Sequence, residues 1–424
     1  MLTPIPFEEL SVALKRAVAT GNFTPGDDSI ILFDLSRLEA LARELCQAFP
    51  ADALHAVAVK ANPLLAVLRV LRDLGLGAEV ASPGELALAV KAGFKPEQIV
   101  FDSPVKSAAD LLTALKLSVR INADSLEELA RISQLLPVVL PKPRHIGVRI
   151  NPQTATGATA YTVTAGKYSK FGVALTEKRA ELLEAYRRYS WLDTVHVHVG
   201  SQSCSIATLV EAIASVMQFV QEVNARTNSQ IKFVDLGGGL PAAYHRSGSV
   251  ASFGEYRQAL QERCPQLFSG DLCLITEFGR HLHATCGTVF SRVEVVKEQC
   301  GTKTAMIHVG ADLLVRECYN PGDWHHDLAI FTASGDLKTS TASEPQTIAG
   351  PLCFSGDILA RDRSLPSIHA ADIVGIADIG AYSFSMWSRY NSRQRPKIVG
   401  YRDDGSFTLI QDRESLESVV AGWS

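Results

Sequence analysis

The chain has 424 residues, of which 46% are hydrophobic and 20% charged, a composition typical of a folded globular protein. Its 41 basic and 45 acidic side chains give a net charge of −4 with no run of one sign, which argues against nucleic-acid and anionic-membrane binding. The N-terminus lacks a signal-peptide pattern, and the eight cysteines are scattered without a CxxC pair. We therefore expect reduced cysteines and a cytoplasmic location.

In chain order, residues up to about 24 predict a helix and a linker, and Ile30–Phe33 predicts a strand that joins the C-terminal part. From residue 54 onward, short apolar runs alternate with amphipathic segments, which is the pattern of βα units. The eight expected strands are Leu54–Val59, Gly77–Ala81, Ile99–Phe101, Ser118–Asn122, His145–Ile150, Thr194–Val199, Ile231–Leu236 and Leu272–Glu277. The helical candidates between them include Pro83–Ala92, Ser125–Leu136, Glu177–Tyr189 and Ile206–Ala225. Eight such units predict an α/β TIM barrel.

Beyond Gly279 the chain changes to β-branched runs with few helical stretches, which predicts a second, mainly antiparallel β domain. These runs are Thr288–Val296, Thr304–Val309, Asp372–Ile379 and Ser406–Ile410. We therefore expect an N-terminal segment over 1–35 that packs with the β domain, a barrel over 36–279 and the β domain over 280–424.

Polar residues follow several of the expected strands, where a TIM barrel places its reactive groups. Lys60 follows the first strand and could form a Schiff base, although a lone surface lysine before a proline turn is the commoner case. His196 and His198 are two apart on the sixth strand and so share a face. One of them could stack on a flat cofactor. The alternatives are a core histidine or a metal site, for which the sequence places no third ligand.

The last two strands end in further candidates. Gly237, Gly238 and Gly239 expose backbone N–H groups that can bind a phosphate, although three glycines also make ordinary turns. Glu277 could keep a pyridine nitrogen protonated and Arg280 could bind a carboxylate or phosphate, or the two could form a structural ion pair. Together these candidates supply the groups that bind pyridoxal phosphate: a lysine, a stacking imidazole, a phosphate-binding loop and an acid.

Eight motifs in the same order resemble the fold type III pyridoxal phosphate enzymes, specifically the diaminopimelate/ornithine decarboxylase family. They are AVKANP (58–63), EVASPGEL (79–86), TAGKYSKFG (164–172), HVHVGSQ (196–202), DLGGGLP (235–241), EFGR (277–280), GPLCFSGD (350–357) and GAYSFSM (380–386). The resemblance covers most of the chain. It implies an alanine racemase-like barrel with a β domain, a carboxy-lyase activity and a homodimer.

The resemblance also implies roles for single residues. Lys60 would carry pyridoxal phosphate covalently, His198 would stack on its ring and Glu277 would contact the pyridine nitrogen. Further cofactor contacts are implied for Ser201, Gly237, Gly238, Gly239, Gly279, Arg280 and Tyr382. Cys353, supplied by the partner subunit, would return a proton to the α-carbon, with Tyr382 also contacting substrate. Without the resemblance, Cys353 is interpreted as a buried small hydrophobe.

Three positions depart from the family pattern. Phe278 replaces the proline of the family's EPGR motif, and Arg316 and Tyr319 match its RPALY stretch with one residue fewer, which makes them substrate-binding candidates beside Arg280. Phe354 follows Cys353 where diaminopimelate decarboxylases have Glu and ornithine decarboxylases Asp, the acid that receives the substrate's distal ammonium. A phenyl ring cannot replace that charge-assisted hydrogen bond.

Phe354 therefore predicts a substrate without a free distal amine, such as citryl-diaminopropionate in siderophore assembly or a carrier-linked glutamate. The alternative is a diaminopimelate decarboxylase of lysine biosynthesis in which another acid, such as Asp357, replaces Phe354. An amino-acid racemase is disfavoured, because racemases usually place arginine where this chain has Glu277. A non-catalytic homologue is disfavoured because Lys60, His198, Glu277 and Cys353 are all retained.

Overall fold

The computed structural model describes residues 3–139, 145–154, 164–202, 204–246, 248–339 and 343–424. The chain forms two compact units. The first comprises 39–242 and 251–282, and the second comprises 2–38, 243–250 and 283–424. The expected boundaries, 35 and 279, fall just before the observed ones, 38 and 282. Residues 243–250 lie inside the range expected for the barrel but belong to the second unit.

The first unit is a closed parallel barrel, which confirms the TIM-barrel prediction. Eight strands pair in the order β2-β3-β4-β5-β6-β8-β9-β10, and β10 pairs with β2 to close the ring. The short β7 (Val173–Ala174) adds to β6. The barrel strands are β2 Leu54–Ala58, β3 Gly77–Val80, β4 Ile99–Asp102, β5 Arg120–Ala123, β6 Ile146–Asn151, β8 Leu192–His196, β9 Phe233–Asp235 and β10 Cys273–Thr276.

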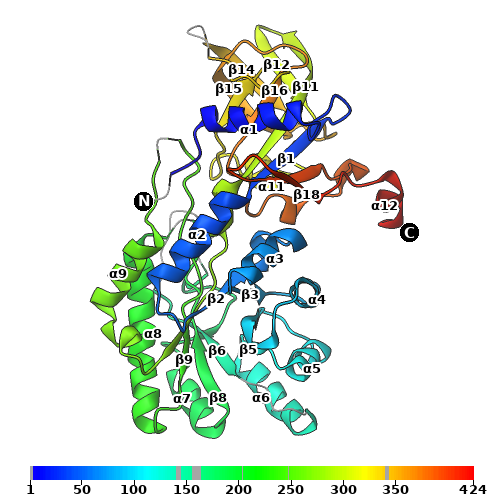
Figure 1. Cartoon of the computed structure of the whole chain (residues 1–424). Coiled ribbons are helices and arrows are strands. Elements are labelled where there is room, and N and C mark those ends of the chain that lie inside the picture. The colour runs from blue at the N-terminus through cyan, green and yellow to red at the C-terminus, as the bar shows by residue number, and fades with distance from the viewer. Residues whose placement is uncertain (1–2, 140–144, 155–163, 203, 247, 340–342) are drawn as a thin grey trace. The chain divides into compact units, whose positions relative to one another are not determined.

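Helices cover the outside of these strands (Figure 1), and their ends follow local sequence signals. Ser82 caps α4 by accepting a hydrogen bond from the backbone N–H of Glu85, Pro83 is its first residue, and Gly93 ends it in the left-handed conformation. Ser125 caps α6 in the same way. The helices are α2 Leu35–Ala48, α3 Leu65–Asp73, α4 Pro83–Ala92, α5 Ala108–Leu117, α6 Leu126–Leu135, α7 Arg179–Arg188, α8 Ile206–Arg226 and α9 Phe253–Arg263.

Helix α8 is long and apolar enough to span a membrane by length and composition alone. Its buried side chains, which include Leu209, Ile213, Met217 and Val220, recur at helical spacing and so form one inward face. The helix is therefore a core helix of the barrel unit.

The second unit is built on a mainly antiparallel sheet, as expected. Its strands run in the order β15-β14-β12-β11-β1-β17-β18, and β16 pairs with both β11 and β13. Helix α1 (Phe7–Ala19) packs Leu10, Leu14 and Ala17 into the same apolar core as Phe290 and Phe331. The remaining elements are β1 Ser29–Asp34, β11 Gly287–Gln299, β12 Thr302–Ile307, β13 Leu328–Phe331, β14 Ser343–Ala349, β15 Ile358–Pro366, β16 Ile373–Ile376, β17 Lys397–Tyr401, β18 Phe407–Gln411, α11 Val315–Tyr319 and α12 Leu416–Ala421, with α10 (Arg280–His283) at the unit boundary.

Several expected strands are longer than the observed ones, and two of these differences affect the interpretation. Ser118 has φ +57° and ends α5 in the left-handed conformation, so β5 begins only at Arg120. Strand β8 ends at His196, so the expectation that His198 lies on that strand was wrong. His198 instead lies in the loop that follows β8, where its side chain contacts the segments that follow β9 and β10.

Candidate active site

The lysine after the first barrel strand lies against a buried acid. Lys60 belongs to a short 3₁₀ turn, Val59–Ala61, directly after β2, and its Nζ forms an ion pair with Oε2 of Glu79 on β3. Glu79 is completely buried. Burial raises the pKa of Glu79 to about 7, and the nearby Lys60 ammonium limits that rise. Glu79 is the first residue of the EVASPGEL motif, but the sequence did not identify it as the partner of Lys60.

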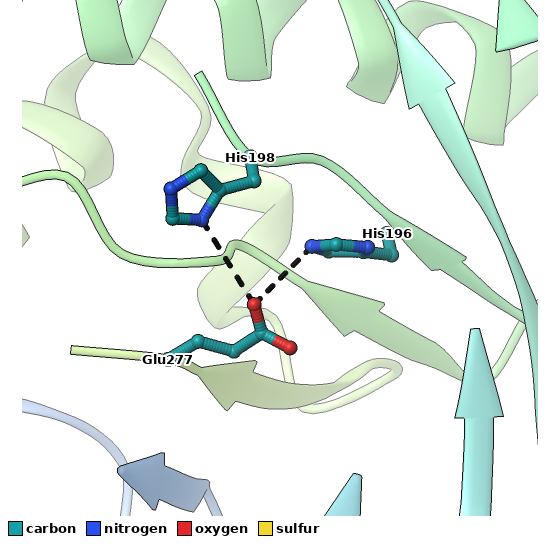
Figure 2. A group of neighbouring side chains, drawn as sticks. All are labelled: His196, His198 and Glu277. Carbon is teal, nitrogen blue, oxygen red and sulfur yellow. Dashed lines mark ion pairs between the residues drawn. The ribbon is translucent and has the colours of Figure 1, made fainter. Parts of the chain in front are cut away.

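Glu277 forms the centre of the barrel's polar cluster. Figure 2 shows its carboxylate facing both histidines, with Oε2 3.3 Å from Nε2 of His196 and 3.9 Å from Nδ1 of His198. Neither Glu277 oxygen has a well-formed hydrogen bond to a described residue, although the Asp235 carboxyl lies beside it. Burial, then the acids Glu79 and Asp102, raise the pKa of Glu277 well above its ordinary value. The carboxyl group is therefore available to a donor from a bound molecule.

His198 is held as a neutral ring. Its Nδ1 accepts a hydrogen bond from the backbone N–H of Gly238 at 3.2 Å, and its backbone carbonyl accepts one from the Thr164 hydroxyl at 2.7 Å. Burial, with Arg149 and Lys60 nearby, lowers the pKa of His198 well below its ordinary value. A fixed, uncharged imidazole is suited to stacking on a flat ring.

The three consecutive glycines are required by close packing. A Cβ atom on Gly237 would lie 2.6 Å from the carbonyl oxygen of Val197, and one on Gly238 would lie 2.5 Å from that of Glu277. The Gly237 N–H donates to Asp235 Oδ1 and the Gly238 N–H to His198. Two of the three N–H groups expected to cradle a phosphate therefore bond within the protein, so the loop offers fewer free donors than the sequence predicted.

The EFGR segment is fixed on both sides of Phe278. Arg280 Nε donates to the Ser201 hydroxyl at 3.0 Å, so these two candidates lie together, and Arg280 is not paired with Glu277 by any ion pair among the described residues. Phe278 is 2% exposed and packs edge-on against Phe253 and Tyr256. In this chain an aromatic cluster holds the loop at the position where the family pattern has proline.

The remaining candidates lie in the second unit and make mainly aromatic contacts. The Arg316 guanidinium lies 4.7 Å from the ring centre of Trp324 and 4.8 Å from that of Tyr382. Tyr319 and Phe354 stack with ring centres 4.9 Å apart and planes inclined by 14°. Phe354 therefore contacts another substrate candidate.

Two expectations about the cysteine loop change. Cys353 is exposed, so its interpretation as a buried hydrophobe was wrong, and its backbone carbonyl accepts a hydrogen bond from the Tyr390 hydroxyl. Asp357 is buried and both of its oxygens accept backbone N–H groups, from Ala311 and Leu352. Because its carboxylate binds the loop together, Asp357 is not free to replace an acid at position 354.

Comparisons with known proteins identify the family. Residues 35–284 match the model of the pyridoxal binding domain of pyridoxal-dependent decarboxylases. The chain belongs to this family. It is similar to the diaminopimelate decarboxylases of Methanothermobacter thermautotrophicus (33% identity, 86% of this chain and 83% of the relative) and Helicobacter pylori strain J99 (31% identity, 92% and 93%). The solved Helicobacter pylori diaminopimelate decarboxylase complexed with L-lysine superposes with a TM-score of 0.85 at 28% identity, covering 96% of this chain and 99% of that one.

The chain is thus a pyridoxal phosphate-dependent amino-acid decarboxylase, and the barrel residues fit the cofactor. Glu277 presents a buried carboxyl without a well-formed hydrogen bond, which suits a protonated pyridine nitrogen. Lys60 remains 37% exposed at its side chain, so its amine is accessible for a covalent link. His196, His198 and Glu277 offer three ligand atoms within 4.8 Å of one another, which supplies the third metal-type ligand that the sequence did not place. We assign no metal to them.

Proposed function

We propose that the chain decarboxylates meso-diaminopimelate to lysine. The observation that carries this proposal is the agreement of both units with diaminopimelate decarboxylases: similarity at 31–33% identity extends over 86–92% of the chain, beyond the cofactor-binding barrel. The part of the chain that includes Arg316, Tyr319 and Tyr382 is therefore covered as well. Arg280 and Arg316 supply the positive charge that a substrate with two carboxylates requires.

The residues divide the work as follows. When bound, pyridoxal phosphate accepts the electron pair that remains on the α-carbon after CO₂ leaves. Lys60 would hold the cofactor through its Nζ amine. His198 would support the ring as a neutral stacking partner, and Glu277 would hold a proton at the pyridine nitrogen. Cys353 or a water would donate the proton that the α-carbon needs.

The contact between Phe354 and Tyr319 favours a second candidate substrate. A stacked aromatic pair gives a distal ammonium no carboxylate, and removing an ammonium from water without compensation costs several kcal/mol. A conjugated amino acid without a free distal amine, such as the siderophore intermediate citryl-diaminopropionate, avoids that cost. This candidate ranks second because the relatives that match along both units are named diaminopimelate decarboxylases.

We further propose a cytoplasmic homodimer whose active sites combine Lys60 of one subunit with Cys353 of the other. The exposure of Cys353 supports this arrangement, because a thiol that acts in a partner's site must be accessible on its own subunit. All eight cysteines are free, as in a reducing compartment.

A substrate panel tests the proposed function. Release of CO₂ is measured with meso-diaminopimelate, ornithine, lysine, arginine, glutamate and conjugated amino acids, with the purified enzyme loaded with pyridoxal phosphate. The proposal expects the highest kcat/KM for meso-diaminopimelate. A conjugated amino acid as the best substrate, with diaminopimelate inactive, would replace the proposal with the second candidate.

A further inference from the structure

His196, which the sequence paired with His198, occupies a different place from its neighbour. It is the last residue of β8 and is fully buried between two acids. Its Nε2 lies 3.3 Å from Oε2 of Glu277 and its Nδ1 lies 3.6 Å from Oδ1 of Asp102. Neither ring nitrogen has a hydrogen-bond partner among the described residues. Because buried polar atoms are normally bonded, this ring is placed to donate to both acids, which it can do only as an imidazolium with an N–H on each nitrogen.

Asp102, on the Nδ1 side of His196, is itself held by a further charged residue. Asp102, the last residue of β4, accepts a hydrogen bond from Arg149 Nη1 on β6 at 3.0 Å. The Arg149 guanidinium also lies 4.6 Å from the ring centre of Phe171. Burial raises the pKa of Asp102, but the nearby His196, Arg149, Lys106 and Lys60 together bring it well below its ordinary value, so this acid is ionised. Arg149, Asp102, His196 and Glu277 thus form a continuous row of charged and polar groups inside the barrel.

We propose that His196 is a positioning residue that joins the Arg149–Asp102 pair to Glu277 and so keeps Glu277 ionised and oriented toward the pyridine nitrogen of the cofactor. The need for such a residue follows from the surroundings of Glu277, whose burial and acidic neighbours favour its protonated form. An N–H donor at Nε2 opposes that tendency. This inference rests on the proposed role of Glu277.

Other titratable groups face the same cluster. Asp235 on β9 lies beside both His196 and Glu277, and burial, then Glu277, raise its pKa to about 8. His198, from the loop after β8, faces His196 and Glu277 as well. Because these groups interact, the test must compare variants at one position within the cluster.

Two substitutions separate the two nitrogens of His196. In His196→Gln the side-chain amide reaches toward Glu277 as Nε2 does, whereas in His196→Asn the shorter amide reaches only toward Asp102, as Nδ1 does. His55→Gln is the matched control. His55 is also a buried barrel histidine, on β2, but its Nδ1 bonds to the Thr276 hydroxyl and it forms no ion pair among the described residues.

Two properties of the holoenzyme are measured: kcat and KM for CO₂ release, and the pH titration of the visible absorbance of the bound cofactor. We expect His196→Asn to lower kcat about tenfold or more with KM within about twofold, and to move the spectral midpoint by about one pH unit. His196→Gln should retain most of kcat, and His55→Gln should leave both properties unchanged. Equal effects of the Asn and Gln variants, or an unmoved spectrum in His196→Asn, would overturn the proposal.

Asp102→Asn provides the second variant if His196→Asn does not fold. It leaves His196 and Glu277 in place but removes the charge at the far end, and we expect a spectral shift in the same direction; an unchanged spectrum would contradict the proposal.

Glu277→Gln separates this inference from the proposed site. If Glu277→Gln leaves the spectrum unchanged, the proposed role of Glu277 fails. If only His196→Asn and Asp102→Asn leave it unchanged, the row through His196 fails and Glu277 keeps its role.

Discussion

The barrel and the second unit hold their candidate residues in opposite surroundings. In the barrel, Glu79, His196 and Glu277 are almost completely buried and each faces a charged or titratable partner. In the second unit, Tyr319 is 60% exposed and stacks on Phe354, Cys353 is exposed, and Arg316 lies against the ring of Tyr382. The comparison indicates that the barrel's own packing fixes these acids and His196, whereas the second unit leaves Tyr319 and Cys353 accessible.

Lys60→Arg should give the largest effect and tests whether the barrel chemistry needs a covalent link. Arginine keeps a positive charge beside Glu79 but cannot form the link, so we expect kcat to fall by about a thousandfold or more and the visible absorbance of the lysine-bound cofactor to disappear. Absorbance spectra and CO₂ release measure both. An active Lys60→Arg enzyme with an unchanged spectrum would show that charge alone suffices.

Subunit mixing tests whether the two kinds of candidate work together across a dimer. The Lys60→Ala enzyme should be nearly inactive, and the Cys353→Ala enzyme should be so when the thiol rather than a water supplies the proton. After subunit exchange about half of the dimers are mixed and each has one intact site, so we expect about a quarter of wild-type activity. The activity is compared with that of each variant exchanged with itself. Absence of recovery after exchange has been verified by mass would place both residues in one subunit's site.

Phe354→Glu sharpens the comparison by giving the second unit the acid that it lacks. A carboxylate for the distal ammonium adds a charge-assisted hydrogen bond of about 1.5–3 kcal/mol, so kcat/KM for meso-diaminopimelate should rise roughly tenfold or more. Phe354→Leu, which also breaks the stack on Tyr319, is the control and should give no rise. If both variants behave alike, position 354 does not contact the distal group.

Glu317→Gln should have the smallest effect on activity, because it concerns stability. Burial raises the pKa of Glu317 in the second unit to about 8, from 4.5. As the pH rises above 4.5, the unfolded chain releases this proton while the folded protein keeps it, so the free energy of unfolding falls until about pH 8. Glutamine does not ionise, so the variant does not lose stability in this way as the pH rises. We expect equal melting temperatures near pH 4 and a higher one for the variant above pH 8; a variant that is less stable than the wild type only above pH 8 would show that the Glu317 charge is favourable.

Much of the barrel could be predicted because its strands are buried on both faces and therefore read as short apolar runs. Strands β14 and β15 were not predicted, since β14 contains Pro345 and the edge strand β15 carries charged residues on its exposed positions. Segment 243–250 also could not be assigned from sequence, because its membership of the second unit depends on long-range contacts such as Arg246 with Asp378.

The candidate site also divides into residues that the sequence identified and contacts that it did not. Lys60, His198 and Glu277 stand in recognisable motifs at strand ends, and the structure brings them to one cluster. Glu79, Asp102 and Asp235 also end or nearly end barrel strands, so the same rule applied to every strand would have found them. The partner of each acid could not be found this way, since the ring of strands, not the local sequence, sets which ends face each other.

Release of CO₂ from meso-diaminopimelate by the wild-type enzyme tests the proposed function most directly. The product is identified as well, with Lys60→Arg as the blank. We predict equal amounts of CO₂ and lysine from the wild-type enzyme and neither from the blank. Release of CO₂ only from a conjugated amino acid, with diaminopimelate left intact, would contradict the proposed substrate while leaving the decarboxylase chemistry of the barrel in place.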